Sequence, residues 1–267
     1  MTDRYARMFA RNSGAFGAFV MLGDPDLEIS AAILDALIEG GADMLEVGIP
    51  FSDPVADGPT IQAAAVRALG NGVTPADCFA LLRAFRDRHP EVPVGILTYA
   101  NIVLARGRDR FYARCAEAGV DSVLVADVPA REAEPFAAAA RSHRVAPVLV
   151  AATNTPPETL RRISELGGGY TYCVARAGVT GAEMEMRLGH DALFARLADH
   201  GAPPPVLGFG ISRPEHVRAA LDAGAAGVVS GSAIVKRIEA APDPLAAVRS
   251  FVAEMKAATG RLSPPEA

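Results

Sequence analysis

The sequence predicts an α/β fold, a single (β/α)8 TIM barrel spanning residues 1–267 with a short N-terminal helix and extra helices after strands 2 and 8. Three observations support this prediction. The chain has 267 residues, a length common among single α/β barrels. Eight short apolar segments alternate with segments of helical apolar spacing. Because these apolar segments show no polar alternation, they are typical of parallel strands buried on both faces of a sheet.

In the first part of the chain, glycines and capping residues mark the element boundaries. Apolar residues at helical spacing predict a helix over 28–39, which ends at Gly40 and Gly41. Thr74 and Pro75 form a cap and first-turn pair for a helix over 76–88. The other elements expected here are helices over 3–12 and 61–69 and strands over 15–22, 43–47 and 92–97.

After residue 97 strands and helices alternate regularly, and three of the helices end at glycine, at Gly119, Gly167 and Gly224. The expected strands cover 122–126, 145–150, 170–174, 206–208 and 227–230, and the expected helices cover 108–118, 131–142, 157–166, 188–199, 213–223, 232–238 and 243–258.

Composition narrows the classes of function. The net charge is −5 and no Lys/Arg-rich run occurs, so nucleic acid and anionic membranes are not expected partners. Apolar runs fall short of the ~18 residues that span a bilayer, and the first residues lead into no signal-peptide core. The three cysteines are odd in number and unclustered, which indicates buried thiols of a protein in the reduced cytoplasm.

Two carboxylates in unlike surroundings predict proton-transfer chemistry. Glu46 interrupts an apolar strand, where a buried charge is costly and the pKa of the carboxyl is expected to rise. Asp57 follows in a loop stiffened by prolines, where we expect a wetter environment and an ionised carboxylate. Such a pair suits general acid–base catalysis. The alternative for Glu46 is a strand-end acid that merely caps the next helix.

Glycine turns after the last two strands predict a phosphate site. Residues 208–212 (Gly-Phe-Gly-Ile-Ser) and 230–233 (Ser-Gly-Ser-Ala) follow neighbouring strands, and the second opens a helix. Backbone N–H groups in such turns can bind a phosphate without a cation. The only lysines, Lys236 and Lys256, fall on predicted helices, so a Schiff-base aldolase is not expected. The histidines show no metal-ligand spacing.

Several segments together resemble the tryptophan synthase alpha chain family. They are residues 45–62 (LEVGIPFSDPVADGPTIQ), 119–129 (GVDSVLVADVP), 176–181 (RAGVTG), 208–212 (GFGIS) and 230–236 (SGSAIVK). The resemblance runs from about residue 14 to residue 258. It implies a lyase that cleaves indole-3-glycerol phosphate to indole and glyceraldehyde 3-phosphate, with no cofactor in the alpha chain.

The resemblance also implies roles for individual residues. Glu46 is the acid–base residue that protonates the indole ring carbon, and Asp57 accepts the indole N–H and stabilises the cationic intermediate. The remaining matches are the indole pocket (Phe19, Leu97, Leu124, Tyr172, Phe209), the phosphate site (Gly181, Gly210, Gly231, Ser232) and a loop that closes over the substrate (Arg176, Thr180). Tyr172 and Phe209 could instead be simple core aromatics.

The resemblance implies a tryptophan synthase beta chain as partner, in an alpha-beta-beta-alpha complex, with the loop over 50–59 facing it. Asp53 is expected to point outward from this loop, and Asp127 to hold its own loop in place. Three alternatives are a stand-alone lyase that releases free indole, a subunit kept only for binding or regulation, and another phosphate-binding barrel such as an isomerase. The presence of both Glu46 and Asp57 argues against a subunit that only binds or regulates. The motif of the closing loop argues against an isomerase.

Overall fold

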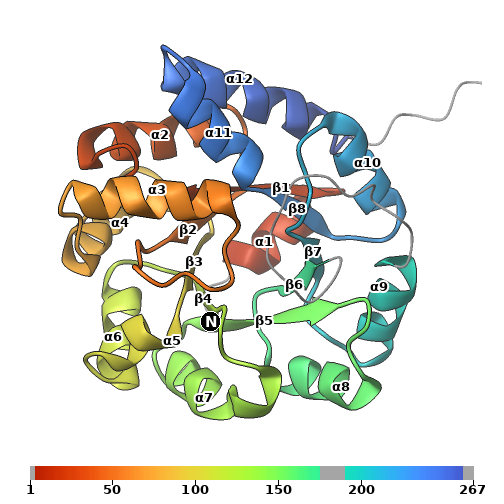
Figure 1. Cartoon of the computed structure of the whole chain (residues 1–267). Helices are drawn as coiled ribbons and strands as arrows, with labels where there is room; N and C mark the ends of the chain where they lie inside the picture. The colour runs from red at the N-terminus through yellow and green to blue at the C-terminus, as the bar shows by residue number, and fades with distance from the viewer. Residues whose placement is uncertain (1–3, 175–189, 261–267) are drawn as a thin grey trace, which may run out of the picture.

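The computed structural model describes residues 4–174 and 190–260, and within them eight parallel strands close into a barrel in sequence order (Figure 1). Each strand pairs with the next, and β8 pairs with β1 to complete the ring. The predicted barrel is therefore confirmed. The strands are β1 (Ala15–Met21), β2 (Met44–Gly48), β3 (Val94–Thr98), β4 (Ser122–Val125), β5 (Ala146–Ala152), β6 (Thr171–Val174), β7 (Pro205–Leu207) and β8 (Gly227–Ser230).

The helices surround the barrel and bury its outer face, except the N-terminal helix, which lies across the amino end of the barrel (Figure 1). They are α1 (Arg4–Arg11), α2 (Leu27–Glu39), α3 (Pro59–Gly70), α4 (Pro75–Arg88), α5 (Ala100–Leu104), α6 (Arg108–Glu117), the 3-10 helix η1 (Ala130–Glu132), α7 (Glu134–Ser142), α8 (Pro157–Leu166), α9 (His190–Asp199), α10 (Pro214–Asp222), α11 (Ser232–Ala240) and α12 (Pro244–Ala257). The extra helices after β2 and β8 are confirmed, whereas α5 and η1 were not predicted.

Local side-chain contacts explain where two of these helices begin. Thr74 caps α4 as predicted, and its side chain and that of Asp77 form a reciprocal capping box. Asp26 caps α2 by accepting the backbone N–H of Ile29 at 2.8 Å. Both caps satisfy N–H groups that the first helical turn leaves without carbonyl partners.

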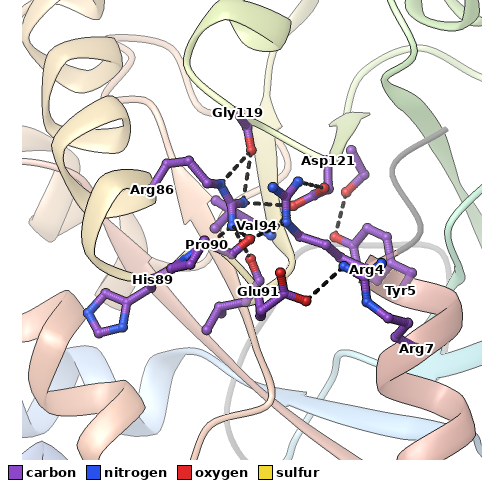
Figure 2. A network of polar contacts seen from close by, with 12 residues as sticks. Arg4, Tyr5, Arg7, Arg86, His89, Pro90, Glu91, Val94, Gly119 and Asp121 are labelled. Carbon is purple, nitrogen blue, oxygen red and sulfur yellow. Dashed lines mark hydrogen bonds and ion pairs between the residues drawn. The ribbon is translucent and has the colours of Figure 1, made fainter.

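A polar network attaches α1 to the amino end of the barrel (Figure 2). Asp121, which lies just before β4, accepts hydrogen bonds from Arg4 at 2.9 Å and from Arg86 at 2.8 Å. Arg86 also donates to the backbone carbonyl of Gly119. The Asp121 side chain is completely buried, so the two guanidinium groups compensate a charge that would otherwise be costly. The network fixes α1 across this end, where Tyr5 enters the barrel interior.

Two apolar cores lie on either side of the strands. The larger one fills the space between the barrel and its helices, and it contains the three buried, free cysteines Cys78, Cys115 and Cys173. The smaller one fills the barrel interior. The prediction of buried thiols is thus confirmed. Among the described residues, no helix is both long and apolar enough to cross a membrane.

Candidate active site

Glu46 lies in the middle of β2 with its carboxyl inside the barrel. Its neighbours in register are Phe19 of β1 and Gly95 of β3. The residue is 1% exposed, and its Oε1 atom accepts a hydrogen bond of 2.6 Å from the Tyr170 hydroxyl. Its Oε2 atom is buried and has no hydrogen-bond partner among residues 4–174 and 190–260. A buried polar atom without a partner is unusual, so this oxygen is available to a bound molecule.

The environment of Glu46 brings its pKa close to neutrality. Burial raises the pKa of this carboxyl from 4.5 to about 7, the Tyr170 hydrogen bond opposes the rise, and the negative charge of Asp57 adds to it. A carboxyl with such a pKa can give and take a proton at neutral pH. The predicted rise is confirmed, and Glu46 caps no helix.

Three hydroxyl groups gather beneath Glu46 where Gly95 leaves room. The Tyr5 and Ser122 hydroxyls are 2.8 Å apart, and the Tyr5 and Tyr170 rings lie 5.4 Å apart between centroids. A Cβ atom on Gly95 would come within 2.6 Å of the Ser122 oxygen and 3.1 Å of the Tyr5 oxygen. These hydroxyls were not among the predicted site residues. The available signal was spacing, because Tyr170 precedes Tyr172 by two residues and shares its face of the strand.

Asp57 is less exposed to water than the sequence suggested. The residue is only 7% exposed, and burial raises the pKa of its carboxyl, while a hydrogen bond with the Tyr99 hydroxyl lowers it. The loop therefore does not leave this carboxylate in contact with bulk water, although Asp57 is less completely buried than Glu46, as expected. Tyr99, which follows β3, covers this side of the loop, and its hydroxyl also accepts the Ala56 N–H at 3.3 Å.

Apolar side chains line the barrel interior next to the two acids. Phe19 and Leu124 belong to the interior core, and Leu97 and Tyr172 pack against it. Burial raises the pKa of the Tyr172 hydroxyl well above its ordinary value, and the charges of Glu46 and Asp57 add to the rise. Phe209, beyond β7, is half-buried and is not part of this core.

Glycine permits the close approach of Tyr172 to the turn after β7. The Tyr172 hydroxyl donates to the Gly208 carbonyl at 2.9 Å, and a Cβ on Gly208 would lie 2.0 Å from the tyrosine ring. Any side chain at position 208 would therefore displace the ring. The phenol is held against this turn at the edge of the apolar interior.

The two glycine turns predicted for phosphate lie next to each other. The Ser230 hydroxyl at the end of β8 donates to the Ile211 carbonyl at 2.6 Å, which ties the turn after β8 to the turn after β7. Gly210 has a left-handed φ of 73°, and Gly231 immediately precedes Ser232, the first residue of α11. N–H groups at a helix start attract anions, so Gly210, Gly231 and Ser232 could hold a phosphate.

The remaining residues named from the sequence are two acids with no predicted catalytic role and three residues beyond β6. Asp127 has a structural role, as expected, but it connects its own loop after β4 to the segment after β3, because its carboxylate accepts the Ala100 N–H at 2.8 Å. Asp53 is exposed, as expected. Arg176, Thr180 and Gly181 lie outside the described residues.

Comparison with known proteins identifies the family. The family model for the tryptophan synthase alpha chain matches residues 5–260. The tryptophan synthase alpha chain of Klebsiella pneumoniae is 56% identical, with 96% of this chain and 98% of the relative covered. That of Shewanella amazonensis is 53% identical, with 97% and 98% covered.

Solved structures agree with the sequence comparison. A tryptophan synthase structure from Mycobacterium tuberculosis has a TM-score of 0.88 at 31% identity and covers 98% of both chains. A structure of the tryptophan synthase a2b2 complex of Pyrococcus furiosus has a TM-score of 0.83 at 36% identity and covers 92% of this chain and 98% of its own. The match over nearly the whole length, together with the buried acids at the mouth of an eight-stranded barrel, establishes that the chain belongs to the tryptophan synthase alpha chain family.

Proposed function

We propose that Glu46 and Asp57 carry out the reaction of this family's lyase, the cleavage of indole-3-glycerol phosphate to indole and glyceraldehyde 3-phosphate. The observation that carries the proposal is the buried Glu46 carboxyl, with a pKa raised to about 7 and one oxygen without a partner among the described residues. It lies beside apolar side chains that suit an aromatic ring, those of Phe19, Leu124 and Tyr172.

In this reaction protonated Glu46 gives its proton to the indole ring carbon that bears the glycerol chain. The ring becomes a cation that can accept electrons. The carboxylate left behind assists removal of the proton from the neighbouring glycerol hydroxyl, the carbonyl group forms, and the carbon–carbon bond breaks. The electrons of that bond return to the ring and restore the aromatic indole. A single carboxyl with a pKa near neutrality suits both proton transfers.

Asp57 and the glycine turns hold the two ends of the substrate. The Asp57 carboxylate accepts the indole N–H and stabilises the cationic ring through its charge, which the buried setting strengthens. Gly210, Gly231 and Ser232 bind the phosphate through backbone N–H groups. By family resemblance Gly181 joins the phosphate site, Phe209 borders the indole pocket, and Arg176 and Thr180 close over the bound substrate.

We further propose that the chain acts in the cytoplasm with a tryptophan synthase beta chain, in an alpha-beta-beta-alpha complex, and needs no cofactor of its own. The Pyrococcus furiosus relative is described as an a2b2 complex with mutual activation, which supports a partner of this kind. The second candidate is the stand-alone lyase, which would form indole at the same rate with and without a beta chain.

The test of the reaction is Glu46→Gln, which keeps the shape of the side chain and removes its proton. We expect the rate of indole formation to fall by ~10²–10⁴-fold, with affinity for glyceraldehyde 3-phosphate unchanged. Glu158→Gln makes the same chemical change at an exposed position of α8 and should leave the rate unaltered. A Glu46→Gln enzyme that retained more than about a tenth of the rate would show that the acid lies elsewhere.

A further inference from the structure

A groove on the outside of the barrel, between α4 and α6, has the features of a second small-molecule site. Its volume is about 240 Å³, somewhat below the ~300–1,000 Å³ of sites for drug-sized ligands. Its apolar lining includes Phe51 of the loop after β2, Ile102 of α5, Phe79 of α4 and Phe111 of α6. The groove is separate from the barrel interior that contains Glu46.

The floor of the groove is a preformed aromatic surface. The Phe79 and Phe111 rings meet edge to face, with centroids 5.8 Å apart at 71°. The Arg114 guanidinium lies 4.5 Å from the centre of the Phe79 ring. Phe79 is 7% exposed and Phe111 is 6% exposed, so the surrounding packing fixes both rings. A flat apolar group could enter with little rearrangement, which lowers the entropic cost of binding.

The rim of the groove is strongly basic in a chain whose net charge is −5. Arg106, Arg110 and Arg114 line it, and residues 106–114 contain four arginines and one aspartate. In the described part of the chain none of the three rim guanidinium groups forms a hydrogen bond or an ion pair. Unpaired guanidinium groups beside an apolar surface are suited to a carboxylate attached to an apolar body.

The groove also connects with the candidate active site. The Phe51 ring, which forms its wall, stacks on Tyr99 with centroids 5.3 Å apart at 28°. The Tyr99 hydroxyl in turn hydrogen-bonds to the Asp57 carboxyl. A ligand that presses on Phe51 therefore acts on Asp57 through two rings in direct contact.

We propose that this groove binds a small aromatic carboxylic acid, with its ring on Phe79 and Phe111 and its carboxylate at Arg106 and Arg110, and that binding alters lyase turnover through Phe51 and Tyr99. The effect on turnover rests on the function proposed for Asp57. Binding of the acid does not depend on that function, and it is measured in the absence of any reaction.

The binding test uses the full chain and 3-phenylpropionate, followed by ligand-observed NMR titration, with the neutral 3-phenylpropanamide as a comparison. We expect the acid to bind and the amide to bind at least ~10-fold more weakly, because the charge-assisted contacts are lost. Inorganic phosphate should not displace the acid. Equal affinity for acid and amide would overturn the proposal.

Matched variants locate the site. Arg106→Ala combined with Arg110→Ala should weaken the acid at least ~10-fold, whereas Arg161→Ala combined with Arg218→Ala removes two exposed arginines elsewhere and should change little. Ala105→Glu should repel the acid and Ala105→Gln should not, because the two differ only in charge. If indole displaces the acid and the rim variants leave its affinity unchanged, the acid binds in the barrel mouth and the proposal is wrong.

The coupling test measures indole formation with and without saturating 3-phenylpropionate. We expect a change of at least ~2-fold in turnover, which disappears in Phe51→Leu although the acid still binds. Binding with unchanged turnover would overturn the connection to Asp57. Loss of acid binding when excess beta chain is added would show that the groove is a surface for that partner instead, and would overturn the proposal as well.

Discussion

At the scale of single residues, the buried carboxyl of Glu46 links catalysis to stability. Its pKa is about 7 in the folded chain, against 4.5 for an ordinary carboxyl. Between these values the folded state binds more protons than the unfolded state, so this residue's contribution to stability is complete below pH 4.5 and is lost as the pH rises through 7. Removing the ionisable group should remove that loss.

We therefore expect Glu46→Gln to gain stability relative to the parent chain as the pH rises. The gain between about pH 5 and pH 8 should be ~2–3 kcal/mol, because each tenfold difference in proton affinity between the folded and unfolded states corresponds to ~1.4 kcal/mol. Urea unfolding at both pH values measures it, and Glu158→Gln, in an exposed position, should show no such trend. A difference between Glu46→Gln and parent that is independent of pH would mean that the carboxyl is not held protonated by burial.

Tyr170 provides a second test at this scale. Its hydrogen bond to Glu46 lowers the pKa of that carboxyl, so Tyr170→Phe should raise that pKa and move the Glu46-dependent limb of the kcat/KM profile to higher pH. Tyr172→Phe is the matched control, because the Tyr172 hydroxyl donates to the Gly208 carbonyl instead. An unmoved limb in Tyr170→Phe, measured by indole formation across the pH range, would contradict this positioning role.

Some residues of the candidate site could be predicted from the sequence, and others could not. A single acid in an apolar strand was enough to predict the burial of Glu46 and its raised pKa. The burial of Asp57 was missed because the covering residue, Tyr99, comes from the next strand–helix unit. Tyr5, Ser122 and Tyr170 come from three separate elements and meet only once the barrel has closed. The spacing of Tyr170 from Tyr172 could have indicated the face of Tyr170, but nothing along the chain connected it with Tyr5 and Ser122.

At the scale of elements, one buried acid helps to attach α1 to the barrel. Asp121 is completely buried and pairs with both Arg4 and Arg86. Asp121→Asn should destabilise the chain by ~3–5 kcal/mol, the usual cost of breaking a buried ion pair by removing one partner. Asp35→Asn is the control, since Asp35 is 33% exposed and pairs with Arg88. Thermal or urea unfolding measures the stability of both variants. Equal, small losses of stability in the two variants would show that Arg4 and Arg86 are solvated well enough without Asp121.

Element boundaries were predicted best where the side chains themselves mark them. The residues that form the cap at Thr74 are close together in the sequence, so the start of α4 could be predicted. By contrast, α5 has only five residues, too few for a helical repeat to show. No helix was therefore predicted in the loop after β3, although this loop contains the helix that carries Ile102 and follows Tyr99 directly.

At the scale of the whole molecule, the barrel was predictable because each strand–helix unit repeats the same pattern and eight units have few other ways to bury parallel strands. The contacts between neighbouring units were not predictable in this way. The loop between β2 and α3 illustrates the difference, because the exposure of Asp53 was predicted from the sequence whereas the burial of Asp57 was not. Asp53 and Val55 are exposed, Val55 at 69%, whereas Asp57 is 7% exposed.

This loop is where a partner could act on catalysis. Free indole is small and apolar, so a cell gains if it passes directly to the next active site. Pro54 and Pro59 limit the conformations that the loop must give up on docking. A partner that contacts Asp53 and Val55 would press on a segment whose buried end holds Asp57. We therefore expect a beta chain to raise lyase turnover at least ~10-fold, equivalent to about 1.4 kcal/mol off the barrier.

The measurement is indole formation by the chain alone and with a beta chain from the same source, together with a sizing column. Asp53→Ala should reduce the activation more than it reduces the basal rate, because it removes an exposed contact and leaves Glu46 and Asp57 in place. Glu254→Ala, on the exposed face of α12, should leave both quantities unchanged. Equal rates with and without the beta chain, and no complex on the column, would favour the stand-alone lyase, since no partner would then act on Asp57 through the exposed side of the loop.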